Sequence, residues 1–366
     1  MNKIKSLQFL RACAFLAVLA AHCDFPLLEG SMGVSIFFVL SGFCMAINYI
    51  PRADELPSTF KGCVRFGCGK IKKLYVLHLL MIAYVVFFLW GMPDSLSDLV
   101  ILIIHALLLQ SLFPSSAIIT PYNGVSWFLS TYMFVCMAAP FIIKCVARLA
   151  SPRDRGMRDI IKAALVVLAI MLVIGYISPF VSAAYFPDIP AYLAYCFPPY
   201  RMLDFTLGAL LGKLFLAREA SPARPSTLHS VLCAAAAAGC FILALVYYPS
   251  APVGIKETLI FVPGSLLAVY SCAFCNARMQ RLLSWPPAVW LGDISGHAYL
   301  IHKNSIMTMR YFLNMLEWKF GYTRTALETV IWFFLSLIMT LLLAQLYLVI
   351  ARKVKGQLSA RLTPTP

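Results

Sequence analysis

The sequence is divided into a series of apolar runs, each long enough to cross a lipid bilayer as a helix. A transmembrane helix needs about 20 apolar residues, and only 12% of the 366 residues are charged, whereas a soluble domain carries about 25%. We therefore predict an all-α fold, a polytopic transmembrane helical bundle of about ten spans. The predicted spans cover residues 6–22, 33–50, 74–91, 125–147, 160–178, 196–216, 229–248, 257–275, 288–310 and 326–350.

The basic residues gather in alternate connections between these runs. Lys3 and Lys5 precede the first run, and a basic segment that begins at Arg352 follows the tenth. Because positively charged connections remain in the cytoplasm, we expect both termini on the cytoplasmic side of the cell membrane. This topology accounts for the net charge of +15, so we predict no nucleic-acid partner. The absence of an N-x-S/T sequon favours a bacterial source.

The run at residues 98–112 is apolar but shorter than the others. If it crossed the membrane, the alternation of basic and neutral connections would invert after it. We therefore predict that 98–112 forms a re-entrant or interfacial helix on the outer side. The chain as a whole is expected to form one transmembrane domain over residues 1–356, followed by a short cytoplasmic tail over 357–366.

Two ionisable residues lie within the first predicted span. Arg11 is near its middle and His22 is at its outer end. Such residues cost about 2.5–3.5 kcal/mol each on insertion scales, which makes them functional candidates. Their separation of eleven residues brings both to one helix face, about 16 Å apart. The alternative is that Arg11 extends toward the cytoplasmic surface and His22 lies at the interface, and these residues alone leave both interpretations open.

A charged pair interrupts the sixth predicted span. Arg201 and Asp204 are neighbours at i and i+3 on a helix. They form either part of a site or an internal ion pair that makes the buried carboxylate tolerable. Gly208 and Gly212 continue the face of Asp204 and predict that another helix approaches closely there.

A polar stripe marks the ninth predicted span. Ser295, Tyr299 and His302 follow the spacing i, i+4, i+7 and therefore share one helix face. A stripe of this kind is typical of a helix that lines a cavity or a substrate path. Hydrogen-bonded packing between helices is the alternative.

A basic cluster follows the second predicted span, with Arg65, Lys70, Lys72 and Lys73. It either binds an anionic head group or fixes the topology. No set of His, Cys, Asp and Glu residues has the spacing of metal ligands, so we predict no metal site.

Several of these residues belong to motifs that resemble those of membrane acyltransferase family 3. The motifs follow the family order and span most of the chain. They lie at residues 10–22 (L-R…H), 33–43 (GVSIFFVLSGF), 127–130 (W-x-L-S), 201–208 (R-x-x-D-F-x-x-G) and 291–302 (LGDIS…YLIH).

The resemblance implies a reaction. Such enzymes move an acyl group, often acetyl, from cytoplasmic acyl-CoA to a hydroxyl or amine of an extracytoplasmic glycan or related envelope acceptor. In this resemblance His22 would be the catalytic histidine, acting as a general base or as an acyl carrier. Arg11 would orient the donor or stabilise developing negative charge, and the basic cluster would hold the phosphates of CoA.

The other matched residues are expected to line the substrate cavity. They are Ser41, Trp127, Ser130, Arg201, Asp204, Ser295, Tyr299 and His302. Asp24, two residues after His22, is a candidate for orienting the imidazole. The chain departs from the family at Lys70-x-x-Lys73, where the family has two arginines; lysine keeps the charge but loses the bidentate geometry for phosphate. It also lacks the glutamate that often follows the W-x-L-S motif.

We therefore predict a multi-pass O-acyltransferase of the cell membrane that uses acyl-CoA, foremost acetyl-CoA, and no metal. One alternative is a polytopic transporter or flippase, because intramembrane charges also mark transport pathways; the lack of an internal repeat argues against it. The other is a membrane sensor domain that kept the fold and lost the activity, which the two departures keep open.

Overall fold

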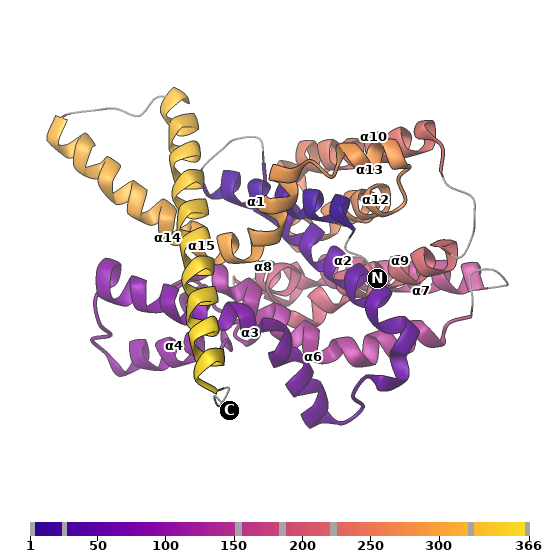
Figure 1. Ribbon diagram of the computed structural model, residues 1–366, viewed down its shortest axis with the longest axis horizontal. Helices are drawn as coiled ribbons and strands as arrows, with labels where there is room; N and C mark the ends of the chain where they lie inside the picture. The colour runs from indigo at the N-terminus through magenta and orange to yellow at the C-terminus, as the bar shows by residue number, and fades with distance from the viewer. Residues whose placement is uncertain are drawn as a thin grey trace.

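The protein is a bundle of α-helices (Figure 1). The computed structural model describes residues 4–23, 28–150, 156–182, 188–219, 225–320 and 326–362, and every regular element within them is helical, which confirms the predicted all-α fold. The helices are α1 (Lys5–His22), α2 (Gly30–Tyr49), α3 (Phe60–Tyr84), α4 (Leu96–Ala106), α5 (Ser116–Ile119), α6 (Trp127–Arg148), α7 (Gly156–Ser182), α8 (Ile189–Tyr195), α9 (Pro198–Glu219), α10 (Thr227–Tyr247), α11 (Val253–Lys256), α12 (Val262–Ala273), α13 (Ala277–Leu282), α14 (Pro286–Phe320) and α15 (Ala326–Leu362).

The predicted spans coincide with helices of this bundle. Within the described ranges, seven helical stretches are long and apolar enough to cross a membrane, and they contain α2, α3, α6, α7, α10, α12 and α15. The other three predicted spans are α1, α9 and α14, which carry charged side chains such as Arg11, Asp204 and Lys303 along their length. The protein is thus a multi-pass membrane protein. The total of ten spans and the sidedness of the termini stay predictions.

The segment predicted to be re-entrant folds as a short helix followed by turns. With eleven residues, α4 is about 16 Å long and cannot cross a hydrocarbon core of about 30 Å. Gly91, at a φ of 89°, redirects the chain after α3 in a conformation that costs glycine little. Ile101 and Leu102 of α4 then pack against Val86 near the end of α3.

Hydrogen bonds tie two of the connections that are predicted to face outward. The carboxylate of Asp188 accepts from the backbone N–H of Ser116 at 2.9 Å and from its hydroxyl at 2.7 Å. These bonds favour the charged form and hold the pKa of Asp188 below its ordinary value. Nε2 of His105 lies 2.7 Å from the carbonyl oxygen of Ile118. The connection that contains α4 and α5 is therefore held by a hydrogen bond within itself and by two bonds to the residue that precedes α8.

Two helix crossings at the centre of the bundle depend on glycine. A Cβ atom at Gly208 of α9 would overlap the carbonyl oxygen of Val39 in α2, and one at Gly292 of α14 would overlap the carbonyl oxygen of Gln8 in α1. The absent side chains let the backbones approach closely, as in other membrane helix pairs. The predicted close approach at Gly208 is confirmed, and the crossings bring α1, α2, α9 and α14 together.

The last helix is longer than its predicted span and differs in direction from α6 and α7. In Figure 1, α15 runs from the top of the view to the bottom, whereas α6 and α7 run across it. It packs against α14. The helix continues to Leu362, so the first residues of the predicted tail over 357–366 are helical.

Candidate functional site

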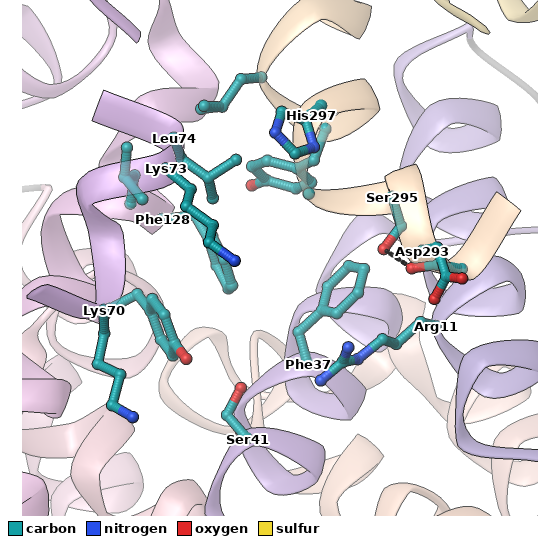
Figure 2. A pocket seen from close by; sticks show the side chains of 16 residues that line it. Arg11, Phe37, Ser41, Lys70, Lys73, Leu74, Phe128, Asp293, Ser295 and His297 are labelled. Atoms are coloured by element: carbon teal, nitrogen blue, oxygen red, sulfur yellow. Dashed lines mark hydrogen bonds between the residues drawn. The ribbon is translucent and has the colours of Figure 1, made fainter. Parts of the chain in front are cut away.

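A cavity of about 280 Å³ lies at the centre of the bundle, between α1, α2, α3, α6 and α14. Figure 2 shows the side chains that converge on it from these helices. Its lining combines cations, hydroxyl groups and aromatic rings, and Arg11 lies across the cavity from Lys70 and Lys73 (Figure 2). Of the predicted site residues, it contains Arg11, Ser41, Lys70, Lys73, Ser295 and Tyr299.

Three cations face this cavity. Arg11 is half-buried, with Nη1 3.4 Å from Oε1 of Gln8 and Nη2 4.0 Å from Sγ of Cys44. Nζ of Lys70 donates to the Tyr49 hydroxyl at 2.6 Å, and Lys73 lies one turn further along α3. A cavity with three cations that also contains hydroxyl groups is suited to an anionic ligand.

The other two members of the predicted basic cluster do not face the cavity. The structure shows that α3 begins at Phe60, so the whole cluster lies on a helix rather than in a connection. Arg65 and Lys72 are seven residues apart and share a face of α3 that differs from the face of Lys70 and Lys73. Both are exposed. The helical phase of α3 thus selects two of the four basic residues for the cavity.

The polar stripe of α14 forms one wall of the cavity. Ser295 lines it and donates to the carbonyl oxygen of Gly292 at 2.8 Å. Tyr299 lines it one turn further along and is 4% exposed. Asp293 and His297 also face this space (Figure 2); neither was predicted to be a site residue, although Asp293 belongs to the LGDIS motif.

An aromatic layer closes the far end of the cavity. The ring of Tyr299 lies 5.0 Å from that of Phe128 and 6.2 Å from that of Phe37, between ring centroids. Phe37 and Phe128 are 5.9 Å apart. These distances are typical of packed aromatic pairs, so the three rings separate the cationic cavity from the region beyond it.

His22 lies beyond the aromatic layer, paired with His302. The centroids of the two imidazoles are 5.0 Å apart and their planes are nearly perpendicular. The ring of Tyr299 is 5.4 Å from that of His302, so it contacts both the cavity and the histidine pair. The third member of the polar stripe, His302, is therefore placed beside the first-span histidine rather than in the cavity lining.

The hydrogen bonds of both histidines define where a proton can be taken. Nδ1 of His22 lies 2.8 Å from the carbonyl oxygen of Val18, and Nδ1 of His302 lies 2.5 Å from that of Tyr299. A carbonyl oxygen only accepts, so each Nδ1 carries the proton and each neutral ring keeps its lone pair on Nε2. Nε2 of His302 is buried and has no hydrogen-bond partner within the described part of the chain. Each imidazole is thus oriented to accept a proton at Nε2.

Arg201 and Asp204 form a fully buried ion pair apart from the cavity. Nη1 of Arg201 lies 2.8 Å from Oδ2 of Asp204, and both side chains are 0% exposed. The guanidinium also donates from Nε to the carbonyl oxygen of Tyr195 at 2.7 Å and packs over the ring of Phe38. These contacts connect α9 to α2 and to the end of α8. The geometry agrees with the internal ion pair that the sequence allowed.

Two residues of the W-x-L-S motif stabilise the connection around α4 and the end of α8. Ser130 donates to the carbonyl oxygen of Leu108 at 2.6 Å and pairs with the hydroxyl of Ser111 at 2.6 Å. The indole of Trp127 packs against Tyr195 at 4.5 Å. Neither lines the cavity, whereas their neighbours Phe128 and Tyr132 do. Asp24 lies outside the described residues.

Lys213 has a role that sequence inspection missed. Its ammonium group donates to the carbonyl oxygens of Val146 and Ala147, each at 2.9 Å, and to that of Leu149. These are carbonyl groups at the end of α6, which a helix leaves unpaired. The sequence signal that could have identified this role is the position of a lysine within an apolar run. Within the described ranges, no group of three or more His, Cys, Asp and Glu residues could hold a metal ion.

Comparison with known proteins places the chain in a family. The model of the family described as an acyltransferase domain, Acyl_transf_3, matches residues 4–349. Acyltransferase MdmB of Streptomyces mycarofaciens is 30% identical over 348 residues, which cover 88% of this chain and 83% of that protein. No solved structure matches the chain.

Two further relatives are longer than this chain. The putative peptidoglycan O-acetyltransferase YrhL of Bacillus subtilis is 25% identical over 82% of this chain and 48% of its own length. The peptidoglycan O-acetyltransferase OatA of Listeria monocytogenes is 24% identical over 82% and 49%. The chain therefore spans about half the length of each. Because the family model covers nearly the whole chain, this membrane protein belongs to acyltransferase family 3.

Proposed function

We propose that the protein transfers an acyl group, foremost acetyl, from cytoplasmic acyl-CoA to a hydroxyl of a cell-envelope acceptor. The observation that carries this proposal is the arrangement of a cationic cavity beside a histidine pair, with Tyr299 in contact with both. A charged nucleotide cannot cross a bilayer, but its thin pantetheine arm fits a passage between helices. The names of the two peptidoglycan O-acetyltransferase relatives support an envelope acceptor.

The cations that line the cavity hold the donor. Lys70 and Lys73 would bind the phosphates of CoA as point charges. Arg11 lies eleven residues before His22 on the same helix, which separates their positions by about 16 Å. That distance is too long for Arg11 to touch a thioester carbonyl beside His22. We therefore assign Arg11 to the donor, where it orients the pantetheine arm or a phosphate.

The transfer takes place at the histidine pair. The acceptor oxygen attacks the carbonyl carbon of the thioester while Nε2 of His22 takes the hydroxyl proton. The carbon–sulfur bond then breaks, and the proton passes from His22 to the departing thiolate, which leaves an ester and free CoA. Passage of the thioester requires the ring of Tyr299 to turn aside from Phe37 and Phe128.

The test measures CoA release by the purified protein with acetyl-CoA and muropeptides as acceptor. We expect Lys70→Gln and Lys73→Gln each to raise the KM for acetyl-CoA by roughly tenfold. Lys72→Gln is the matched control, because Lys72 is on the same helix and is exposed like Lys73 but does not line the cavity. Equal KM values for the three variants would contradict the proposed donor site.

A second measurement separates the proposed general base from an acyl carrier. Isotopically labelled acetyl-CoA is added without acceptor, and the protein is digested and analysed by mass spectrometry. We expect no acetyl group on the peptide that contains His22. An acetylated His22 peptide would overturn the direct transfer and support the covalent route. Exchange of acceptor across vesicles without CoA release would instead support the transporter alternative.

A further inference from the structure

A second cavity, of about 290 Å³, lies between α3, α14 and α15. It uses the later turns of the two helices that already line the cationic cavity. On α3 the stripe that begins with Lys70 and Lys73 continues to Leu77 and Met81, and on α14 it continues to Ser305. The two cavities therefore follow one another along the same pair of helices, although their linings differ in chemistry.

The lining of the second cavity is apolar except for the five polar side chains of Tyr84, Asn304, Ser305, Thr308 and Tyr347. Tyr84 and Thr308 satisfy each other through a hydrogen bond of 2.6 Å between their oxygens. Asn304 donates from Nδ2 to the carbonyl oxygen of Met81 at 3.3 Å, which orients its amide. None of the residues that line this cavity is charged, so it offers no counter-ion to a charged ligand.

Two buried polar atoms of this lining have no hydrogen-bond partner among the residues that the structure describes. They are Oδ1 of Asn304 and Oγ of Ser305, which belong to side chains 3% and 1% exposed. A buried polar atom is costly to leave unpaired. One atom is an acceptor and the other belongs to a hydroxyl that can donate. Together they can pair with a single ligand hydroxyl group, which both donates and accepts a hydrogen bond.

The mouth of the cavity faces lipid. Leu80 of α3 and Leu346 and Ile350 of α15 line it, and their side chains are 49%, 55% and 51% exposed. Apolar side chains exposed on a membrane-spanning protein contact hydrocarbon. A ligand therefore enters this cavity from the bilayer rather than from water.

We propose that this cavity binds a membrane-dissolved molecule with a hydrocarbon body and one hydroxyl group, an aliphatic alcohol in its simplest form. The hydrocarbon contacts the leucine and isoleucine lining. The ligand hydroxyl donates to Oδ1 of Asn304 and accepts from Oγ of Ser305. Ser305 follows His302 by three residues, so the hydroxyl is held one helical turn beyond the histidine pair. The site is defined by its own cavity and does not depend on the acyl-transfer proposal.

The test uses photolabelling of the full chain in phosphatidylcholine vesicles. The probe is a twelve-carbon primary alcohol with a diazirine at mid-chain, and the matched comparison is the same chain without the hydroxyl. We expect the alcohol to label peptides of α3, α14 and α15 about tenfold more than the alkane at equal concentration, since two hydrogen bonds distinguish them. Excess unlabelled dodecanol should compete. Equal labelling by both probes would show adventitious lipid only and would overturn the site.

Variants test the two polar atoms directly. We expect Asn304→Leu with Ser305→Ala to reduce labelling by the alcohol to the level of the alkane, and Ser305→Thr, which keeps the hydroxyl, to preserve it. Ser265→Ala in α12 is the control, because that buried serine bonds to the carbonyl oxygen of Phe261 away from the cavity. Unchanged labelling of a folded Asn304→Leu/Ser305→Ala variant would overturn the assignment. If that variant does not fold, the comparison of the alcohol and alkane probes on the unaltered chain still tests whether the cavity binds a hydroxyl group.

Discussion

The central helices and the peripheral helices of this protein divide its chemistry between them. In the 18-residue apolar segment of α2, 72% is buried inside the protein, whereas in the corresponding segments of α7, α10 and α15 the buried share is 17% each. The peripheral helices are apolar because they face lipid. The central group, α1, α2, α9 and α14, carries Arg11, His22, His302 and the Arg201–Asp204 pair, because neighbouring helices shield their charges from hydrocarbon. Two of the helices that carry charged residues along their length, α1 and α14, therefore contribute the histidine pair and, with α2, α3 and α6, line the cavity.

The largest effect that separates the two regions should come from their histidines. We expect His22→Ala in α1 to lower the rate of CoA release by about 10²- to 10⁴-fold, the usual contribution of a general base. His229→Ala in α10 should leave the rate unchanged, because His229 lies near Tyr270 and Cys233 at the periphery. Turnover by equal amounts of monodisperse protein is the measurement. A rate in His22→Ala that equals that of the unaltered protein would remove the central helices from the chemistry.

The buried ion pair should be the next largest difference. Asp204→Leu leaves the fully buried Arg201 without its carboxylate, which should lower the free energy of unfolding by about 3–5 kcal/mol. The double variant Arg201→Met/Asp204→Leu should recover most of that loss. The peripheral control Lys162→Met removes an exposed charge of α7 and should change stability by less than about 0.5 kcal/mol. Thermal unfolding followed by size-exclusion chromatography measures all three, and an unaffected Asp204→Leu variant would count against a structural pair.

Two glycines, one in a central helix and one in a peripheral helix, should differ in how their substitution changes stability. A Cβ at Gly208 would overlap the Val39 carbonyl oxygen, whereas one at Gly239 of α10 would meet nothing within 4 Å. We expect Gly208→Ala to destabilise the protein by about 1–3 kcal/mol, because α2 and α9 must separate. Gly239→Ala should stabilise it by about 0.5–1 kcal/mol, since alanine favours a helix over glycine. Thermal unfolding that gave both variants the same sign of change would refute this distinction between a glycine at a helix crossing and one on an open helix face.

The smallest effect on stability should come from Asp188, a carboxylate in a connection outside the bundle core. The pKa of Asp188 is below its ordinary value because Ser116 donates two hydrogen bonds to the charged form. Its folded-state pKa is thus lower than its unfolded-state pKa, so its contribution to stability is present above the unfolded value and is lost as pH falls through the folded value. The difference in unfolding temperature between the protein and Asp188→Asn should therefore shrink as pH is lowered from neutrality to below about 4. A difference that does not vary with pH would contradict this assignment.

Helical periodicity and charge were enough to predict several features of the site. The face shared by Ser295 and Tyr299 lines the cavity, and the glycine at position 208 marks a close crossing. Both conclusions follow from geometry within one helix, which is the same wherever the helix is placed. The separation of Arg11 and His22 along one helix followed in the same way, since α1 is continuous from Lys5 to His22.

Contacts between helices could not be predicted in this way. The pairing of His22 with His302 joins residues 280 positions apart. The basic cluster was expected to act as one group, but the phase of α3 turned Arg65 and Lys72 away from the cavity. His297 lines the cavity without a pattern that marked it, and Asp293 lines it as part of the LGDIS motif, although it was not predicted to be a site residue. Each of these outcomes depends on which helix lies opposite, and a single sequence carries no direct signal of that.

The sequence by itself determined that this chain is a helical membrane protein, that its polar residues are costly enough to need a reason, and that they resemble acyltransferase motifs. These conclusions follow from the energetics of single side chains in lipid and from the period of one helix. Only the tertiary structure decided which polar residues meet. It gathered Arg11, Lys70 and Lys73 around one cavity and placed His22 beside His302 behind an aromatic layer. The reason is that helix packing within a membrane depends on the close fit of small residues such as Gly208 and Gly292, which is a property of pairs of helices.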